Sequence, residues 1–156
     1  LETVAQMGGD LLLKVLSQID SGTETPVPQN EEDASFCELL KKEDGLIDWS
    51  NTAEEIDCKI RAFNPWPGAY TIVNDTILRL HQSKVYNSDI AEAQIVVEEK
   101  DRIPGKVIGT DSKEGILIQT GSGIIAVQNL QWQAKKAMNC KDFMNGSRNF
   151  PGTICK

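Results

Sequence analysis

The sequence predicts a mainly β protein with helices: a small antiparallel barrel of Greek-key, OB-like form, preceded by an amphipathic helix, a linker and a short helical segment. Three observations predict it. Apolar residues recur at helical spacing up to residue 63 and alternate with a period of two after residue 69. Pro65 and Pro67 lie between the two halves, and no helix continues through them. The second half divides into short strands joined by tight turns, which is typical of a small barrel.

Residues 1–20 are predicted to form one amphipathic helix. Val4, Leu11 and Val15 belong to an apolar stripe at near-helical spacing, and Gly22 supplies a C-cap. A single helix cannot bury such a stripe alone. Because the chain begins inside this pattern and without a methionine, we expect it to be a piece of a longer chain.

Residues 21–35 are predicted to form an extended linker, since they hold two prolines and many polar and acidic groups. One or two helical turns are expected over Ser35–Lys42, followed by a turn and a short extended piece at Leu46–Trp49. Thr52 and Glu55 have the spacing of a capping box, so a second helix is expected from there to the prolines.

The proline corner reads IRAFNPWPGA (60–69). The two prolines push the residues before them towards extended geometry, and Gly68 permits a turn. We expect Trp66 to be buried at this corner, because tryptophan is highly buried on average. The alternative is that Arg61 and Trp66 face a ligand.

After the corner, Asn74-Asp75 is a hairpin signal between two strands. In the second strand, Leu78 and Leu80 are predicted to point one way and Arg79 the other. Residues 87–102 are expected to be a long loop or a small subelement. Three further strands and a final helix with Asn139 as N-cap are predicted from the alternation and the turn residues. The predicted strands, including the first two, are 69–73, 76–86, 106–110, 116–120 and 124–132, and the helix is 139–145.

Charge is unevenly distributed. The net charge is −7, but residues 1–58 carry 14 acids and 3 bases, residues 59–134 carry 8 of each, and residues 135–156 carry 5 bases and 1 acid. This predicts an acidic connector and a basic tail. No apolar run approaches the length of a membrane span. The four cysteines have no CxxC spacing, which favours reduced thiols in a cytosolic protein over a zinc site or a disulfide framework.

Catalytic chemistry has little support in the sequence. His81 is the only histidine, and its place in a strand predicts a surface or packing role. Gly121-Ser122-Gly123 is not followed by a helix and is therefore a hairpin turn. We predict no catalytic residue, metal ligand or cofactor-binding residue in this chain.

Nucleic-acid binding has better support, because a small barrel with aromatic residues and a basic tail is a common platform for it. Basic residues gather in three parts of the sequence and are predicted to contact backbone phosphates: Lys41, Lys42, Arg61, Lys135, Lys136, Lys141 and Arg148. The alternative is that these lysines and arginines are only solvated surface charges.

Several motifs in order resemble those of the methionyl-tRNA formyltransferase family, over nearly the whole chain. They are LLKKEDGLIDWSNTAEEIDCKIRAFNPWPGAYT (39–71), PGKV (104–107), LQWQAKKAMNCKDFMNG (130–146) and FPG (150–152). The resemblance implies that residues 1–20 are the last helix of a truncated Rossmann-like formyltransferase domain. Residues 21–35 are then the interdomain linker, and residues 36–156 the C-terminal OB-like domain.

The family transfers a formyl group from 10-formyltetrahydrofolate to the α-amino group of methionine esterified to initiator tRNA. Its catalytic residues and its folate site lie upstream of Leu1, so the resemblance implies a cytoplasmic tRNA-binding portion that is inactive alone. The implied partners are the backbone of initiator tRNA and the upstream catalytic domain. The resemblance carries tRNA contacts to Lys42, Arg61, Lys135 and Lys136, while Lys41, Lys141 and Arg148 are added from charge alone.

Two alternatives stand beside this one. The same C-terminal domain occurs in other folate-dependent formyltransferases, namely those that act on UDP-sugars and 10-formyltetrahydrofolate dehydrogenase. From another class, the chain is a structural module that packs on its catalytic domain and binds nothing itself.

Overall fold

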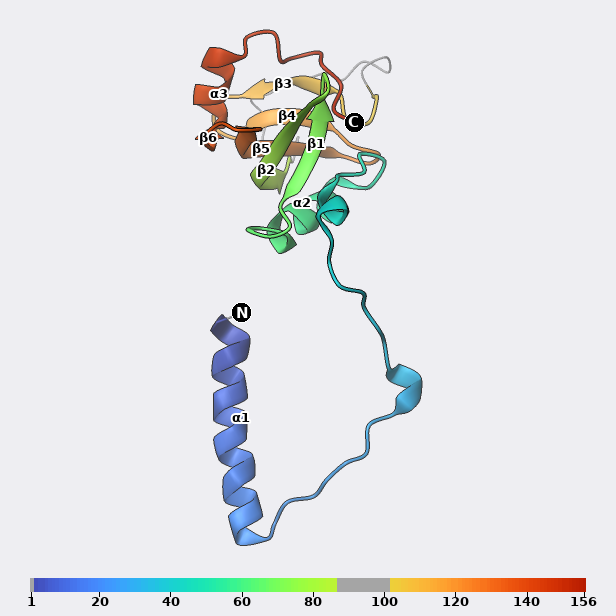
Figure 1. The fold of residues 1–156 in the computed structure, drawn as a ribbon, viewed down its shortest axis with the longest axis vertical. Helices are drawn as coiled ribbons and strands as arrows, with labels where there is room; N and C mark the ends of the chain where they lie inside the picture. The colour runs from blue at the N-terminus through green and yellow to red at the C-terminus, as the bar shows by residue number, and fades with distance from the viewer. Residues whose placement is uncertain (1, 87–101) are drawn as a thin grey trace. The chain divides into compact units, whose positions relative to one another are not determined.

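A computed structural model describes residues 2–86 and 102–156. The chain divides into two compact units, Leu1–Glu38 and Leu39–Lys156. The first unit contains helix α1 (Glu2–Ser21) and the short 3-10 helix η1 (Glu31–Asp33). Gly22 follows α1 with a φ of +65°, in the left-handed conformation expected of a glycine C-cap. The predicted first helix is thus confirmed (Figure 1).

The apolar side chains of α1 are exposed, including Val4, Leu11 and Leu16. The other described residues of the first unit form only η1 and extended chain, and none of the residues of η1 is buried. An exposed apolar stripe of this kind favours a partner surface, because most helix stability in proteins comes from packing of the apolar face.

One segment, which runs from the end of the first unit into the second, differs from the prediction. Ser35–Lys42 was expected to be helical, but the chain has no helix there until η2 (Lys42–Gly45), a 3-10 helix, begins at its end. The Asp44 side chain accepts a hydrogen bond from the Lys41 amide and caps η2. The expected helical turns over Ser35–Lys42 are therefore wrong.

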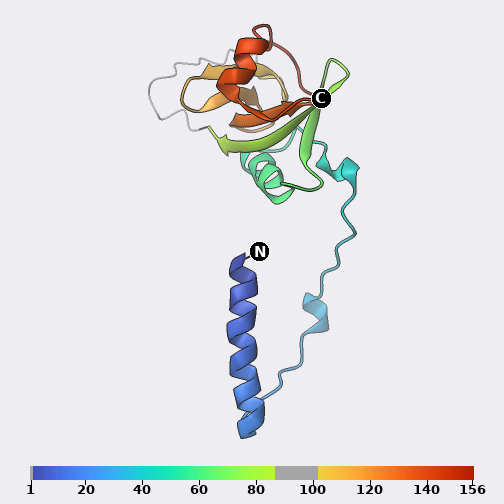
Figure 2. The ribbon, with the colours of Figure 1, turned by 60° about the vertical axis from the view of Figure 1, so that its left-hand side comes forward.

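Helix α2 (Ala53–Ala62) begins at the predicted capping box. The Thr52 hydroxyl accepts from the Glu55 amide at 3.2 Å, and the Glu55 carboxylate accepts from the Thr52 amide at 2.9 Å. The helix buries Ala53, Ile56 and Ile60 against β2 and β5. Figure 2 shows α2 beneath the long strand β2.

Six antiparallel strands form one sheet in the order β1-β2-β5-β4-β3, with β6 paired to β5. Their bounds are β1 Ala69–Val73, β2 Thr76–Val85, β3 Val107–Asp111, β4 Gly115–Gln119, β5 Ile124–Trp132 and β6 Met138–Asn139. Five of these were predicted from alternation, whereas β6 is too short to show any. Asn74 and Asp75 have φ of 47° and 61°, the backbone that a two-residue hairpin turn requires.

The last residues of the chain complete the sheet. The Val107 amide donates to the Thr153 carbonyl and the Cys155 amide to the Gly105 carbonyl, each at 2.9 Å. Ile72 and Lys156 exchange two backbone hydrogen bonds, also of 2.9 Å. Residues 153–156 therefore bridge the two outermost strands, β1 and β3, and the predicted barrel-like domain is confirmed.

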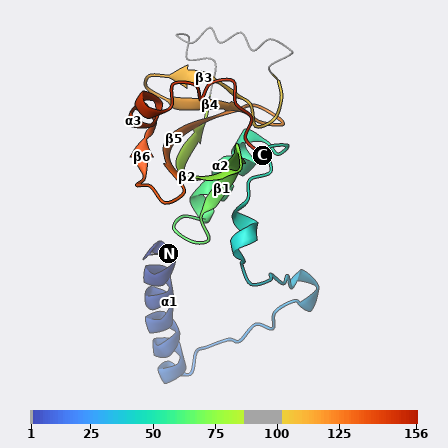
Figure 3. The same ribbon diagram turned by 45° about the horizontal axis from the view of Figure 1, so that its top comes forward.

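The core lies between this sheet and two helices. It includes Trp49, Ile60, Leu80, Val127 and Phe143. Helix α3 (Cys140–Gly146) begins at Asn139, whose side chain accepts from the Asp142 amide, as predicted. Figure 3 shows α3 and β6 on one side of the barrel and α2 on another.

Two further sequence expectations concern a loop and membrane spans. The long loop predicted for residues 87–102 lies outside the described residues, apart from residue 102. Within the part that is described, no helix is long and apolar enough to cross a membrane.

Candidate nucleic-acid interface

The proline corner presents Trp66 to solvent. Its side chain is 56% exposed, and Pro67 takes the buried position next to it. The expectation that Trp66 is buried is therefore wrong. The physical reason is that Gly68 bonds back through its amide to the Phe63 carbonyl at 2.9 Å, which closes the corner around Pro67 and leaves the indole outside.

Beside Trp66 lies a cavity of about 270 Å³. It combines two basic side chains with two aromatic ones, and the lining residues come from η2, the corner and the first hairpin: Lys42, Pro65, Trp66, Pro67, Tyr70, Ile77 and Arg79. None of them is acidic. Cations and aromatic faces are the two elements that a single-stranded nucleic-acid site requires.

Two glycines allow the walls of this cavity to approach each other. A Cβ atom on Gly45 would lie 2.2 Å from the Gly68 carbonyl oxygen and 3.1 Å from the Tyr70 ring, so η2 reaches the corner only because residue 45 is glycine. At Gly68, which has a φ of +83°, a Cβ atom would lie 3.0 Å from the Arg79 guanidinium. Lys42 of η2 and Arg79 of β2 therefore both line the cavity at this corner.

The register of the sheet extends this surface across three strands. Tyr70 of β1 pairs with Arg79 of β2, and Arg79 pairs with Gln131 of β5, so the three side chains lie in one row on one face. The Gln131 side-chain amide donates to the Lys135 carbonyl. The turn that holds Lys135 and Lys136 therefore lies at the end of this row. We call Lys42, Trp66, Tyr70, Arg79, Lys135 and Lys136 the basic aromatic face.

Arg61, another predicted contact, lies on α2 and has a partner. Its Nε donates to the Asp57 carboxylate at 2.8 Å, and this pair raises the pKa of the Arg61 guanidinium. Asp57 also accepts from the Ser83 hydroxyl at 2.8 Å, which ties the pair to β2. Part of the Arg61 charge is thus already compensated. Lys41 directly precedes η2 and lies next to Lys42 in the chain.

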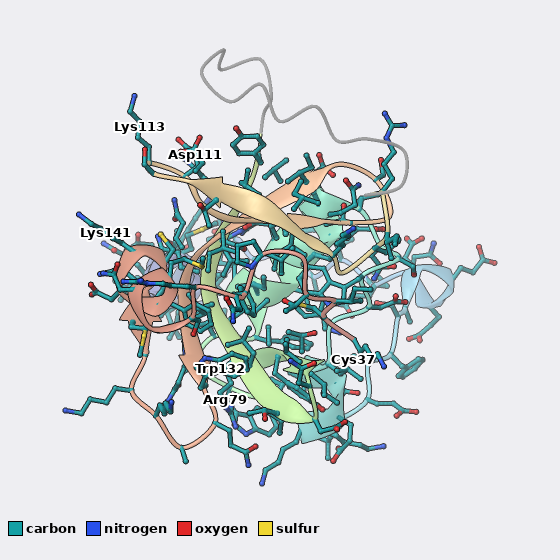
Figure 4. All side chains as sticks on the ribbon, turned by 90° about the horizontal axis from the view of Figure 1, so that it is seen from above. Cys37, Arg79, Asp111, Lys113, Trp132 and Lys141 are labelled. Carbon is teal, nitrogen blue, oxygen red and sulfur yellow. The ribbon has the colours of Figure 1, made fainter. Side chains whose placement is uncertain are left out.

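Lys141 and Arg148 lie elsewhere on the domain. Lys141 is on α3 and lines a second cavity, of about 350 Å³, between that helix and the β3–β4 hairpin. Asp111 lines the same cavity. Figure 4 shows Lys141 beside Asp111 and Lys113, away from Arg79 on β2. Arg148 follows the end of α3, so the seven predicted residues do not form one site.

Three further observations concern groups that could carry catalysis or hold a metal ion. His81 contacts the Gln131 side chain through Nε2 at 2.9 Å, in the strand position expected for it. Burial raises the pKa of the Cys155 thiol to about 12, so it is a poor nucleophile. Across residues 2–86 and 102–156, no group of histidine, cysteine and acidic side chains is arranged to hold a metal ion.

Arg79 and Tyr70 were not among the predicted site residues. The alternation in the second strand did predict that Arg79 points to the opposite side from Leu78 and Leu80, which was the only signal available. Its place beside Trp66 depends on the pairing of β1 with β2 and on the close approach at Gly68, and neither is visible as a motif.

Comparison with known proteins gives a consistent result. Residues 39–148 match the family model described as formyl transferase, C-terminal domain. The chain is 49% identical over 140 residues to the methionyl-tRNA formyltransferase of Treponema denticola, covering 90% of this chain and 42% of that protein. It is 40% identical over 145 residues to the protein of that name from Dictyoglomus thermophilum, covering 93% and 44%. The chain thus spans less than half the length of these relatives.

Among solved structures, the fold is similar to that of HypX from Aquifex aeolicus. A variant of that protein aligns with a TM-score of 0.59 at 17% identity, over 92% of this chain and 24% of the other. The complex of HypX with tetrahydrofolic acid aligns with a TM-score of 0.56 at 18% identity. At these identities the similarity extends to the fold alone.

Proposed function

The chain belongs to the formyl transferase C-terminal domain family, and on that premise we propose that it is the tRNA-binding C-terminal part of a methionyl-tRNA formyltransferase. The full enzyme would transfer a formyl group from 10-formyltetrahydrofolate to the methionine of initiator methionyl-tRNA. The reaction and the folate would belong to a catalytic domain upstream of this chain. The chain alone would therefore bind tRNA in the cytoplasm without catalysing formyl transfer.

The organisation of the chain follows from the same proposal. Residues 1–20 would be the last helix of the upstream Rossmann-like domain, and its surface would cover the exposed apolar stripe of α1. Residues 21–35 would connect the two domains. Residues 36–156 would form the tRNA-binding domain.

The observation that carries the proposal is the basic aromatic face. Arg79 and the Lys135–Lys136 turn lie along one row of three paired strands, and Lys42 of η2 lines the cavity beside Tyr70 and Arg79 of that row. Cations spaced along a sheet contact successive phosphates, which positions tRNA without reading its sequence. In the full interface Lys41, Arg61, Lys141 and Arg148 would add phosphate contacts from other surfaces of the domain, with Arg61 the weaker because Asp57 pairs with it.

The salt dependence of tRNA affinity tests this proposal. With four to six phosphate contacts, log K is expected to fall with log[salt] with a slope of about −3 to −5, because bound counterions are released. Filter binding of the chain to initiator tRNA between low and physiological salt measures the slope. Absence of binding at low salt, or a flat slope, would instead favour a structural module that only packs on its catalytic domain.

The double variant Lys135→Glu, Lys136→Glu locates the contact. We expect it to weaken tRNA binding equally for different tRNAs and to reduce the magnitude of the salt slope by about 2, since two phosphate contacts are lost. The matched control Lys135→Arg, Lys136→Arg keeps both charges and should bind like the unmodified chain. Equal affinity of the Glu and Arg variants would remove these two lysines from the interface.

A further inference from the structure

We propose that the cavity beside Trp66 receives one unstacked nucleobase of the bound tRNA, with the base stacked on the indole and its phosphate between Lys42 and Arg79. The inference rests on the proposed function, because it assumes that the chain binds tRNA. It adds a specific contact to a surface otherwise described by charge.

Trp66 differs from the other two tryptophans in its environment. Trp49 is 5% exposed, and its indole N–H donates to the Thr71 hydroxyl at 2.9 Å. Trp132 packs against Phe143 and Phe150, with ring centroids 5.5 and 6.1 Å away. Trp49 is thus a core residue, and Trp132 is partly buried against the core. Trp66 is the most exposed of the three, and it lies on a corner whose backbone is closed by a hydrogen bond rather than on a free loop.

The charge at the cavity is suited to a phosphate. Two of its seven lining residues are basic and none is acidic. In the described part of the chain, neither Lys42 nor Arg79 takes part in an ion pair. The Arg79 guanidinium lies close to Gly68 and therefore at the corner itself. A planar guanidinium at this place can form two parallel hydrogen bonds to a phosphate.

The size of the cavity limits what it can hold. Its volume of about 270 Å³ lies just below the range of about 300–1,000 Å³ typical of sites for whole drug-sized ligands. It is several times the roughly 30 Å³ occupied by one water molecule. One planar ring system with its phosphate at the rim fits this space better than a lone anion or a duplex.

A proline-rich peptide is the other occupant that aromatic grooves with proline walls can bind. Such a peptide has no charge to match the Lys42 and Arg79 cations. A polynucleotide has both the flat ring and the phosphate, so the residues present favour it. The peptide is treated below as an outcome that would overturn the proposal.

The test compares tRNA binding by variants of the full chain. Trp66→Ala is expected to weaken binding by about 5- to 100-fold, the usual effect of losing one stacked base. Its salt slope should be unchanged, because no charge is removed. Trp66→Phe keeps an aromatic face and should stay within about 3-fold of the unmodified chain. Arg79→Gln should weaken binding and reduce the magnitude of the slope by about 1.

Two controls separate stacking from a general effect. Phe36→Ala removes an aromatic ring that is 97% exposed but lies outside the cavity, and it should leave affinity unchanged. Tryptophan fluorescence provides a second measurement, since stacking quenches the exposed indole: tRNA should quench the unmodified chain, and this part of the quenching should be absent in Trp66→Phe. Urea unfolding of each variant confirms that the fold is retained.

The outcomes are distinguishable. Suppose that the unmodified chain binds tRNA with the expected slope, that Trp66→Ala binds equally well, and that tRNA quenches the fluorescence of the unmodified chain and of Trp66→Phe to the same extent. The stacking inference then fails and the proposed function stands. Equal losses in Trp66→Ala and Trp66→Phe would also overturn stacking. Quenching by a proline-rich peptide that tRNA does not displace would assign the cavity to a peptide. Absence of tRNA binding at low salt would overturn both proposals.

Discussion

The Thr71 hydroxyl joins three separate parts of the barrel-like domain. It accepts a hydrogen bond from the Trp49 indole N–H and donates one to the Lys156 carbonyl, each of 2.9 Å. Thr71 is fully buried. A buried polar group left without a partner costs about 1–3 kcal/mol, so this single hydroxyl keeps the entry segment and the chain end bonded to β1.

Cys155 makes stability depend on alkaline pH. The side chain is 2% exposed, and burial raises the pKa of its thiol from 9.0 to about 12. Below pH 9 the thiol is protonated in both states and the full stability is present. Between pH 9 and about 12 only the unfolded state loses the proton, so this contribution falls by about 1.4 kcal/mol per pH unit.

Cys155→Ala is expected to remove this dependence. Urea unfolding at pH 8, 9, 10 and 11 should show the difference in unfolding free energy between the unmodified chain and the variant shrinking above pH 9. Cys37→Ala, which alters an exposed thiol, is the matched control and should follow the unmodified chain. Parallel pH curves for Cys155→Ala and the unmodified chain would contradict the prediction.

Sequence patterns predicted the direction of side chains correctly in β2, but they predicted the burial of Trp66 wrongly. The alternation in β2 correctly directed Leu78 and Leu80 inward and Arg79 outward, because strand geometry is local. The environment of Trp66 is set by a hydrogen bond between Gly68 and Phe63 and by the approach of η2, neither of which is a local property. An average tendency to burial therefore gave the wrong result there.

At the scale of elements, the segment 153–156 pairs its backbone with the sheet as a strand does. It has no regular run, yet its backbone bonds to Gly105, Val107 and Ile72. The approach is close: a Cβ atom on Gly105 would lie 2.2 Å from the Cys155 carbonyl oxygen. Residue 105 must be glycine for the segment to fit between the two edges.

Removing Lys156 should destabilise the domain by about 1–3 kcal/mol, because Ile72 loses two backbone partners and the Thr71 hydroxyl loses its acceptor. Lys156→Ala keeps the backbone and should stay within about 0.5 kcal/mol of the unmodified chain. Urea unfolding measures both, and hydrogen exchange at the Ile72 amide should accelerate only in the deletion. Equal stability of the deletion and the substitution would show that the backbone bonds contribute little.

Elements with a capping signal were predicted well. The Thr52–Glu55 box and the Asn139 cap each mark a helix start in the structure, because the bonds that form them are within four residues. Over Ser35–Lys42 the apolar residues indicated a helix, but the structure has none before Lys42. Strand β6 has two residues, too few for a period of two to be detected.

At the scale of the whole molecule, charge opposes the proposed function. The chain has a net charge of −7, and most of the excess acid lies in residues 1–58. A polyanion is repelled by this segment even while the basic aromatic face attracts it. The repulsion reaches only about one Debye length, roughly 10 Å at 0.1 M salt.

Neutralising part of this acid tests the balance. The variant Glu31→Gln, Glu32→Gln, Asp33→Asn alters η1, which has no buried residue, and removes three negative charges. We expect tRNA to bind about 2- to 10-fold more tightly at low salt, with a faster association rate. At 1 M salt the difference should vanish. A gain that persists at high salt would mean that the substitutions create a direct contact.

The completion of the barrel was not predictable in detail from the sequence. The β hairpins could be predicted because each pairs two strands that are consecutive in the sequence. The bonds between β1 and the chain end join residues 85 positions apart, and no short-range pattern identifies them. For the same reason the row from Tyr70 to Gln131, and with it the basic aromatic face, became visible only in the assembled sheet.

That separation of 85 positions also fixes how long Thr71 waits for its hydrogen-bond acceptor, Lys156, while the chain is being synthesised. A ribosome adds about 5–20 residues per second, so Lys156 emerges roughly 4–17 s after Thr71. Throughout this interval the backbone N–H and C=O of Ile72 on β1 lack their Lys156 partners, and unpaired strand edges can pair with other chains. During synthesis, this part of β1 is therefore open to pairing with neighbouring nascent chains until residue 156 has been added.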